Sequence, residues 1–360
     1  MTKFWSKAVH RLHPYVPGEQ PQDQLYIKLN TNENPYPPAP SVISALKSVA
    51  NEKLRLYPDP NCSELKNAIS HYYNLSDQSV FVGNGSDEVL AFAFQAFFDS
   101  DKKLRFPDIS YSFYPAYCSL YGIPFERVPL NNNLEVNPAD YTDTGSGVII
   151  PNPNAPTGVA LSLNQVQVLL ETNKEAVVII DEAYVDFGAQ SAISLIDKYP
   201  NLLVTQTFSK SRSLAGLRCG FAIGHPNLIE ALERVKNSFN SYPLDSFAIK
   251  GAKAAIEDSN YFEETCAKVI STRNKVCKYL EKEGFQVLNS SSNFLFVTHA
   301  TFPAVSLYEE LKAQGVLVRY FDKPRIDNYL RISIGTDKEM NQFLDVITSI
   351  LKNEVPQKSK

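Results

Sequence analysis

The amino-acid sequence predicts an α/β fold, with a large domain whose mostly parallel β-sheet is flanked by helices and a smaller α+β domain after it. Up to about residue 245, short apolar runs alternate with segments of helical periodicity, which is typical of strand–helix–strand units. Several runs are almost continuously apolar, as expected for strands covered on both faces. From about Ser246 the order becomes strand, helix, strand, strand, helix, which indicates the α+β domain.

The large domain is expected to span residues 40–245, after an N-terminal arm. Residues 1–39 are rich in proline and asparagine, which predicts an extended arm that joins the smaller domain. VFVGNGSDE, beginning at Val80, predicts a strand, a glycine turn and a helix start. GVIIPNPNAPTG predicts a buried strand and a turn, and Ser162 is expected to cap the next helix. AVVIIDEAYVDF, LLVTQTFSK and CGFAIG predict further strands.

The smaller domain is expected to span residues 246–360, and its boundary rests on the change of pattern. Residues 248–284 form one long region of helical periodicity. FQVLNSSSNFLFVT, VLVRYF and YLRISIGT predict strands, and VSLYEELKAQG and DKEMNQFLDVITSILK predict helices.

Composition and charge exclude several classes of protein. The 360-residue chain has a net charge of −4 and no cluster of Lys and Arg of the kind that binds nucleic acid or an anionic membrane. Its five cysteines are scattered without a C-x-x-C pair, so neither a disulfide framework nor a metal site is expected. No window is apolar enough to span a membrane, and the N-terminus lacks a signal-peptide core. We therefore expect a cytoplasmic protein that acts on small molecules.

Polar residues follow four of the predicted strands, at the edge where open α/β sheets bind ligands. They are Gly85, Ser86 and Asp87, then Asn154, then Asp181 and Tyr184, and finally Ser209 and Lys210, with Arg218 shortly after. Taken alone, each residue is more often a turn former, a cap or a solvated charge than a functional group. Glu88 stands where a dinucleotide fingerprint needs its third glycine, which argues against a dinucleotide.

As a set, these residues match the needs of pyridoxal 5′-phosphate. This cofactor needs a lysine amine for a Schiff base, an acidic partner for its pyridinium nitrogen, and N–H groups with a cation for its phosphate. Lys210, Asp181 and Arg218 supply the amine, the acid and the cation. An ionised Asp181 would keep the ring nitrogen protonated, and Lys210 would move a proton between the substrate Cα and the cofactor.

The same stretches resemble the fold-type I aminotransferases, which depend on pyridoxal 5′-phosphate. GNGSDE, PNPNAPTG, DEAYVDF, FSKSRSLAGLRCG and LRISIGT occur in the order of that family, and the resemblance covers nearly the whole chain. Within it, LHPY, LNTNENP, RLYPDP, PDISYSFY and the pairing of VLVR with LRISIGT resemble the histidinol-phosphate aminotransferases. The five ordered motifs make the first resemblance specific, whereas related subfamilies share most of the stretches behind the second.

The resemblance implies a role at the cofactor for each matching residue. Lys210 corresponds to the Schiff-base lysine, Asp181 to the partner of the ring nitrogen, and Tyr184 to the tyrosine that contacts the phenolic oxygen. The phosphate would be held by Gly85, Ser86, Asp87, Ser209 and Arg218, and the ring would stack on Tyr111. Tyr57 would reach the cofactor phosphate of the neighbouring subunit, which implies a homodimer.

At the substrate, the resemblance assigns Arg331 to an acidic group, and Tyr15 and Arg319 to a phosphate; Asn32 and Tyr57 are expected there as well. Tyr26, Phe113 and Tyr114 are expected in the core rather than in a substrate pocket.

One position departs from the family pattern. The family reads N-N-P-T-G, whereas this chain has Ala155 directly before the proline and Asn154 before that. We expect Asn154 to contact the phenolic oxygen. The alternatives are that Tyr184 carries more of this contact, or that Asn154 only shapes the turn.

The implied activity is amino transfer between L-histidinol phosphate and 2-oxoglutarate or glutamate, a step of histidine biosynthesis. An aromatic amino-acid aminotransferase and a pyridoxal-phosphate-dependent decarboxylase of a phosphorylated amino acid would use the same scaffold. A nucleotide-binding oxidoreductase, or a ligand-binding module without catalysis, remains the alternative of a different class.

Overall fold

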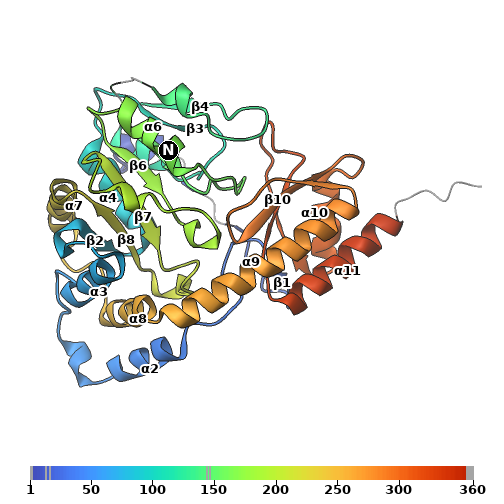
Figure 1. Cartoon of the computed structure of the whole chain (residues 1–360), viewed down its shortest axis with the longest axis horizontal. Helices are drawn as coiled ribbons and strands as arrows, with labels where there is room; N and C mark the ends of the chain where they lie inside the picture. The colour runs from blue at the N-terminus through green and yellow to red at the C-terminus, as the bar shows by residue number, and fades with distance from the viewer. Residues whose placement is uncertain (1–2, 13, 16–17, 143–144, 146, 354–360) are drawn as a thin grey trace, which may run out of the picture.

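The structure is a computed structural model that describes residues 3–12, 14–15, 18–142, 145 and 147–353. Its largest sheet has seven strands in the order β2-β8-β7-β6-β5-β3-β4 (Figure 1). The strands are β2 (Val80–Gly83), β3 (Leu104–Pro107), β4 (Phe125–Val128), β5 (Val148–Pro151), β6 (Val178–Asp181), β7 (Leu202–Thr207) and β8 (Gly220–Gly224). Only β8 runs antiparallel to its neighbours, so the predicted mostly parallel sheet is confirmed.

Successive residues of these strands pack into different hydrophobic clusters. Ile149 and Ile179 belong to a cluster with α4 (Gly85–Phe97), α5 (Tyr114–Tyr121) and α7 (Pro226–Phe239). Ile150 and Ile180 belong to another, with α2 (Pro40–Val49), α3 (Ser63–Tyr73), α6 (Leu163–Thr172) and α8 (Ser246–Glu257). Because neighbouring strand residues point to opposite faces, helices cover both faces of the sheet, which explains the nearly continuous apolar runs.

A second, antiparallel sheet of four strands has the order β12-β13-β10-β9. It consists of β9 (Phe285–Val287), β10 (Phe294–His299), β12 (Arg319–Tyr320) and β13 (Leu330–Ser333). It shares a hydrophobic cluster with α9 (Ser259–Lys282), α10 (Ala304–Ala313) and α11 (Asp337–Asn353). The arm joins this unit, because β1 (Ile27–Lys28) pairs in parallel with β11 (Val316–Leu317).

The helical region after residue 245 differs from the expectation. It forms two helices, because Asp258 ends α8 and its side chain accepts a hydrogen bond from the Tyr261 N–H at 3.3 Å, capping α9. Helix α8 packs against α2 and α3 within the cluster of the large sheet, and α9 runs from there to the small sheet (Figure 1). We therefore propose a domain boundary near Asp258 rather than at Ser246.

Smaller elements complete the described part of the chain. They are α1 (Lys7–Arg11) and the 3-10 helices η1 (Glu52–Arg55), η2 (Asp77–Ser79), η3 (Pro138–Tyr141), η4 (Val185–Phe187), η5 (Ala192–Leu195) and η6 (Ala215–Leu217). Ser162 caps α6 as predicted, in a capping box with Gln165. Within the described ranges, no helix has both the length and the apolar character of a membrane span.

Candidate active site

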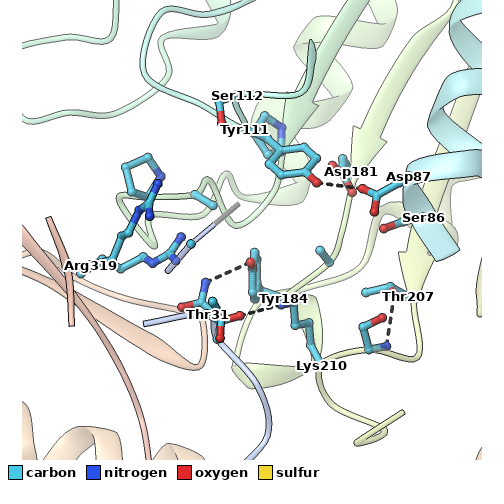
Figure 2. Close-up of a pocket in the computed structure, with 18 of the residues that line it drawn as sticks. Thr31, Ser86, Asp87, Tyr111, Ser112, Asp181, Tyr184, Thr207, Lys210 and Arg319 are labelled. Atoms are coloured by element: carbon cyan, nitrogen blue, oxygen red, sulfur yellow. Dashed lines mark hydrogen bonds between the residues drawn. The ribbon is translucent and has the colours of Figure 1, made fainter. Parts of the chain in front are cut away.

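The carboxyl ends of β5, β6 and β7 border a cavity of about 280 Å³. Other walls come from the start of α4, residues 110–112, β12, β13 and the arm, including its residues 30–32. Most of the predicted site residues line it: Tyr15, Asn32, Ser86, Asp87, Tyr111, Asp181, Tyr184, Ser209, Lys210, Arg218, Arg319 and Arg331. Figure 2 shows Asp87 and Ser86 on one side of this space and Arg319 on the other, with Tyr184 and Lys210 between them.

One end of the cavity is the N-terminus of α4, which begins at Gly85 and Ser86. N–H groups in the first turn of a helix lack intrahelical partners and favour an anion. Two glycines permit close contacts here: a Cβ on Gly85 would lie 2.6 Å from Nη2 of Arg218, and one on Gly220 would lie 2.4 Å from the backbone nitrogen of Ser86. Arg218 Nη1 also donates to the Ser209 hydroxyl at 3.4 Å. These groups together form a cradle suited to a phosphate.

The Asp87 carboxylate orients two other site residues. Arg218 Nη2 donates to its Oδ2 at 3.1 Å. The Tyr111 hydroxyl donates to its Oδ1 at 2.7 Å (Figure 2). Burial, with a further contribution from Asp87, raises the pKa of Tyr111, so this hydroxyl stays protonated and remains a donor. Asp87 thus holds the aromatic ring and the guanidinium at the edge of the cavity.

Asp181 ends β6 and is buried at the cavity wall. Its Oδ2 accepts from the Tyr114 hydroxyl at 2.8 Å, and its Oδ1 accepts from the Thr205 hydroxyl at 3.1 Å. Burial raises the pKa of Asp181 to about 6, although both hydrogen bonds oppose the rise. A cationic N–H group against this carboxylate would favour its ionised form. Asp181 is therefore suited to bind a protonated ring nitrogen.

Lys210 brings an amine into the cavity from the loop after β7. Its Nζ donates to the Thr31 carbonyl oxygen at 3.1 Å and lies 5.7 Å from the centre of the Tyr184 ring. The Asn32 side-chain amide donates to the Tyr184 hydroxyl at 3.0 Å. An amine, a phenol and a segment of the arm therefore meet at one point (Figure 2).

The opposite end of the cavity carries two arginines. Arg319 and Arg331 are direct cross-strand partners in β12 and β13, and both line the cavity. Like charges in such a pair destabilise a sheet, so an anionic ligand accounts best for them. Arg331 Nη2 donates to the Asn30 carbonyl oxygen at 2.9 Å, while its Nε is buried without a hydrogen-bond partner among the described residues. An anion would satisfy that N–H.

Three predicted site residues do not line the cavity. The Gly85 backbone lies against Arg218, as described above. Tyr57 is 82% exposed and stacks on Tyr242, with ring centres 4.7 Å apart. The Asn154 amide turns to the Ile109 carbonyl at 3.0 Å and the Thr157 hydroxyl at 3.1 Å, because these buried groups need partners.

Where the sequence departs from the family pattern N-N-P-T-G, Ala155 lines the cavity and Asn154 does not. The contact expected between Asn154 and the phenolic oxygen is therefore not prepared in this structure, since the amide that would make it is engaged elsewhere.

Sequence reasoning missed several groups that support the site. Tyr114 was expected in the core and is fully buried, yet its hydroxyl binds Asp181. A buried tyrosine usually needs a partner for its hydroxyl, and this was the available signal. The sequence carried no such signal for Thr205 or Thr31. Thr205 is an ordinary strand residue, and Thr31 acts through its backbone carbonyl.

Comparison with known proteins agrees with the predicted fold class and reaction class. Residues 25–347 match the family Aminotransferase class I and II. The chain is 55% identical over 354 residues to histidinol-phosphate aminotransferase 1 of Hydrogenovibrio crunogenus, covering 98% of this chain and 99% of that protein. It is 57% identical over 344 residues to the histidinol-phosphate aminotransferase of Pseudomonas putida, covering 96% and 99%.

Among solved structures, the histidinol-phosphate aminotransferase of Sinorhizobium meliloti in complex with pyridoxal-5′-phosphate has the same fold, with a TM-score of 0.86 at 22% identity. That match covers 98% of this chain and 99% of the other. The large parallel sheet, the small antiparallel sheet and the lysine cavity between them are thus accounted for by one family: this chain belongs to the class I and II aminotransferases.

Proposed function

We propose that this chain transfers an amino group between L-histidinol phosphate and 2-oxoglutarate or glutamate, with pyridoxal 5′-phosphate as its cofactor. The relatives named for this activity match nearly the full length of the chain at 55–57% identity. The observation that carries the proposal is that the cavity offers anion-binding groups at both ends, with the Lys210 amine between them. One end suits the cofactor phosphate and the other suits an acidic substrate.

The residues present fit the cofactor. Among the described residues, the buried Asp181 carboxylate accepts hydrogen bonds from two neutral hydroxyls, and its pKa is raised, so a protonated ring nitrogen would complete its environment. The cradle of α4 with Arg218 and Ser209 would hold the phosphate. Tyr111 presents an aromatic ring at the same wall.

Lys210, Asp181 and Tyr184 would then carry the chemistry. When bound, pyridoxal 5′-phosphate supplies an aldehyde carbon and an electron-withdrawing ring. Asp181 would keep the proton on the ring nitrogen, and the Tyr184 hydroxyl would donate to the phenolic oxygen. The Lys210 amine is placed to take up and return the proton at the substrate Cα.

The arginine pair supports the choice of substrate. Histidinol phosphate carries a phosphate and no carboxylate, whereas glutamate and 2-oxoglutarate carry two carboxylates. Arginine binds either oxyanion through paired N–H groups, so Arg319 and Arg331 can serve both halves of the reaction. Tyr15 lies at the same wall, with its ring centre 4.6 Å from that of Phe113.

The experiment compares amino donors with 2-oxoglutarate as acceptor. We expect kcat/KM for histidinol phosphate to exceed that for histidinol by about 100-fold or more, because without the phosphate the buried Nε–H of Arg331 stays unpaired. Phenylalanine is the third donor. A preference for phenylalanine would indicate the aromatic amino-acid aminotransferase, and release of carbon dioxide from a phosphorylated amino acid would indicate the decarboxylase.

We further propose a cytoplasmic homodimer in which Tyr57 reaches the site of the neighbouring subunit. Tyr57 belongs to an exposed apolar group that includes its sequence neighbours Leu54 and Leu56 and its stacking partner Tyr242. Exposed apolar groups of this kind are typical of protein interfaces. All five cysteines are free thiols, as suits a reducing compartment.

A further inference from the structure

Asn32 follows Thr31, the residue whose carbonyl oxygen accepts from Lys210, and its own backbone N–H donates to Ser333 of the small sheet. It is 1% exposed and has a φ of +58°, a left-handed conformation that asparagine adopts more readily than most residues. We expected its side chain to contact substrate. Instead, both ends of its amide bind protein groups.

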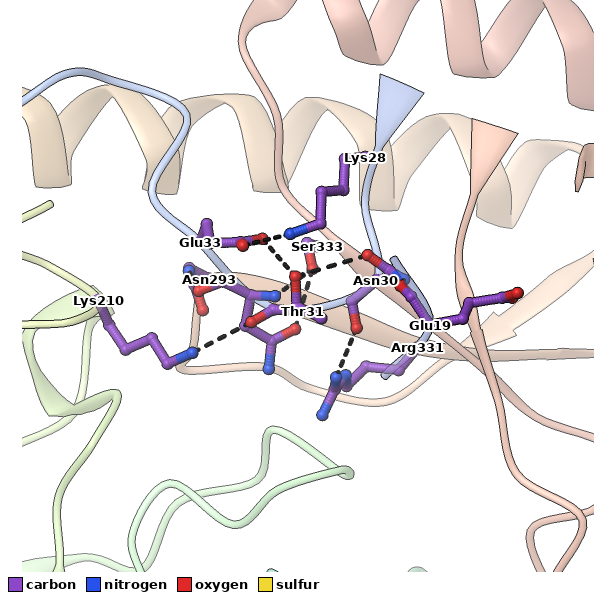
Figure 3. Close-up of polar contacts among 10 residues, drawn as sticks. Glu19, Lys28, Asn30, Thr31, Glu33, Lys210, Asn293, Arg331 and Ser333 are labelled. Atoms are coloured by element: carbon purple, nitrogen blue, oxygen red, sulfur yellow. Dashed lines mark hydrogen bonds and ion pairs between the residues drawn. The ribbon is translucent and has the colours of Figure 1, made fainter. Parts of the chain in front are cut away.

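Successive carbonyl groups of the arm accept hydrogen bonds from different sides of the cavity. Asn30 pairs with Arg331 at 2.9 Å and Thr31 with Lys210 at 3.1 Å (Figure 3). Asn32 pairs with the Asn293 side chain at 2.9 Å. The left-handed conformation of Asn32 turns the chain between the Thr31 and Asn32 carbonyl groups, so these two face different partners. One short segment thus links the amine of the large sheet to the arginine of the small one.

The hydrogen bonds of Asn32 determine where each proton points. Its backbone N–H donates to the Ser333 Oγ at 2.9 Å, and the Ser333 hydroxyl donates to the Asn32 Oδ1 at 2.9 Å. With its oxygen occupied, Asn32 turns its amide nitrogen to Tyr184 and donates to that hydroxyl at 3.0 Å. Because the Tyr184 hydroxyl accepts this hydrogen bond, its own proton can be donated to another acceptor.

We propose that Asn32 is a positioning residue whose amide directs the Tyr184 proton into the cavity, toward the phenolic oxygen of the cofactor. The inference rests on the proposed function. On the adjacent wall, Ala155 has no donor and the Asn154 amide is engaged by Ile109 and Thr157. The hydroxyl of Tyr184, which Asn32 orients, is therefore the donor that remains for the phenolic oxygen.

The test is a double-mutant cycle on the cofactor-loaded protein, with Asn32→Gly and Tyr184→Phe made singly and together. Glycine keeps the left-handed backbone and its bonds to Ser333 and Asn293, so the substitution removes only the side-chain amide. The main readout is the pH midpoint of the visible absorbance change of the cofactor, which reports the proton held at the Lys210 nitrogen.

We expect Asn32→Gly to raise this midpoint by about 0.5–1 pH unit, the size that loss of one neutral hydrogen bond produces. The midpoint rises because a less stabilised phenolic oxygen makes the neighbouring nitrogen hold its proton more tightly. kcat should fall about 10-fold while KM changes less than about twofold, since the substrate contacts remain.

In the Tyr184→Phe background, Asn32→Gly should produce no further shift of the midpoint. An equal shift in both backgrounds would overturn the proposal. Asn74→Gly is the matched control, because Asn74 is an exposed asparagine with a φ of +55° at the end of α3; it should leave the midpoint unchanged.

A second variant covers the case in which Asn32→Gly does not fold. Ser333→Ala removes the donor that orients the Asn32 amide, so it should raise the midpoint by a smaller amount, and an unchanged midpoint would overturn the proposal. A wild-type protein that shows no visible cofactor band would refute the proposed function itself, so the two failures are distinguishable.

Discussion

Lys210 carries its amine to the centre of the cavity, where the Thr31 carbonyl oxygen accepts a hydrogen bond from it. In the sequence it is indistinguishable from a solvated surface lysine. What distinguishes Lys210 is that the fold brings it to the same cavity as Asp181, Tyr184 and the helix start at Gly85, all of which come from other parts of the chain.

We expect Lys210→Ala to lower transamination by about 10³-fold or more, since it removes the group that moves the proton. The cofactor should still bind without a covalent bond, because the phosphate cradle and Asp181 are unchanged. Borohydride reduction followed by mass measurement of the protein separates covalent from non-covalent binding. Lys250→Ala, at an exposed lysine paired with Glu64, is the control and should keep full activity. Near-normal turnover of Lys210→Ala would contradict the assignment.

Asp181→Asn keeps the volume of the side chain and removes its charge. We expect the affinity for the cofactor to fall about 10- to 100-fold, the usual value of a hydrogen bond to a charged group. Fluorescence titration of the cofactor-free protein measures this, with the exposed Asp197→Asn as control. Unchanged affinity would mean that Asp181 does not bind the ring nitrogen.

At the scale of elements, Glu182 ties the end of β6 to η5 and to β7. Its carboxylate accepts from the Ser191 hydroxyl at 2.6 Å, from the Ala192 N–H at 2.6 Å and from the Gln206 side chain at 2.9 Å. Burial nevertheless raises the pKa of Glu182 from its ordinary value of 4.5 to about 7. The folded protein therefore binds this proton more tightly than the unfolded chain does.

The sign of the pH dependence follows. Below its ordinary pKa of 4.5 the Glu182 carboxyl is protonated in both the folded and the unfolded state and does not change the free energy of unfolding. As the pH rises from there to about 7, the unfolded chain releases the proton more readily than the folded protein, so the free energy of unfolding falls progressively. In Glu182→Gln this fall is absent, so the free energy of unfolding of the variant should gain about 3 kcal/mol on that of the wild type over this range. Urea unfolding at several pH values measures the difference, with the exposed Glu309→Gln as control. Parallel pH profiles for wild type and Glu182→Gln would contradict the expectation.

At the scale of the whole molecule, the site depends on two units held together. The Asn30–Asn32 segment bonds to both sheets, and Arg325 of the small unit donates to the Asp108 carboxylate at 2.9 Å and to the carbonyls of Leu130 and Asn131. These contacts keep the arginine end of the cavity opposite the phosphate cradle.

The proposed sharing of Tyr57 between subunits predicts complementation. Lys210→Ala and Tyr57→Ala should each be impaired alone. Mixing them under conditions that exchange subunits should restore activity to about a quarter of the wild-type value, because half of the dimers are mixed and each mixed dimer has one complete site. Activity assays of the mixture, with each variant alone as control, measure this. No recovery despite demonstrated subunit exchange would refute a shared site.

The class of fold and the places of the main polar groups could be predicted from the sequence alone. Nearly continuous apolar runs predicted strands buried on both faces. The carboxyl ends of parallel strands meet at one edge of a sheet, so the positions of Asp181 and Lys210 after two such runs were enough to place them together. The local signal at Ser162 was equally sufficient, because a capping box involves residues only three positions apart.

The groups that surround those residues could not be predicted, because they depend on tertiary contacts. The hydrogen-bond partners of the Asn32 side chain are Tyr184 and Ser333, which lie far from it in the sequence. No local sequence pattern predicts such contacts. The same holds for the packing of α8 on the large unit and for the turn of the Asn154 amide toward Ile109. Periodicity reports which face of an element is apolar, whereas the identity of the partner depends on how distant segments pack.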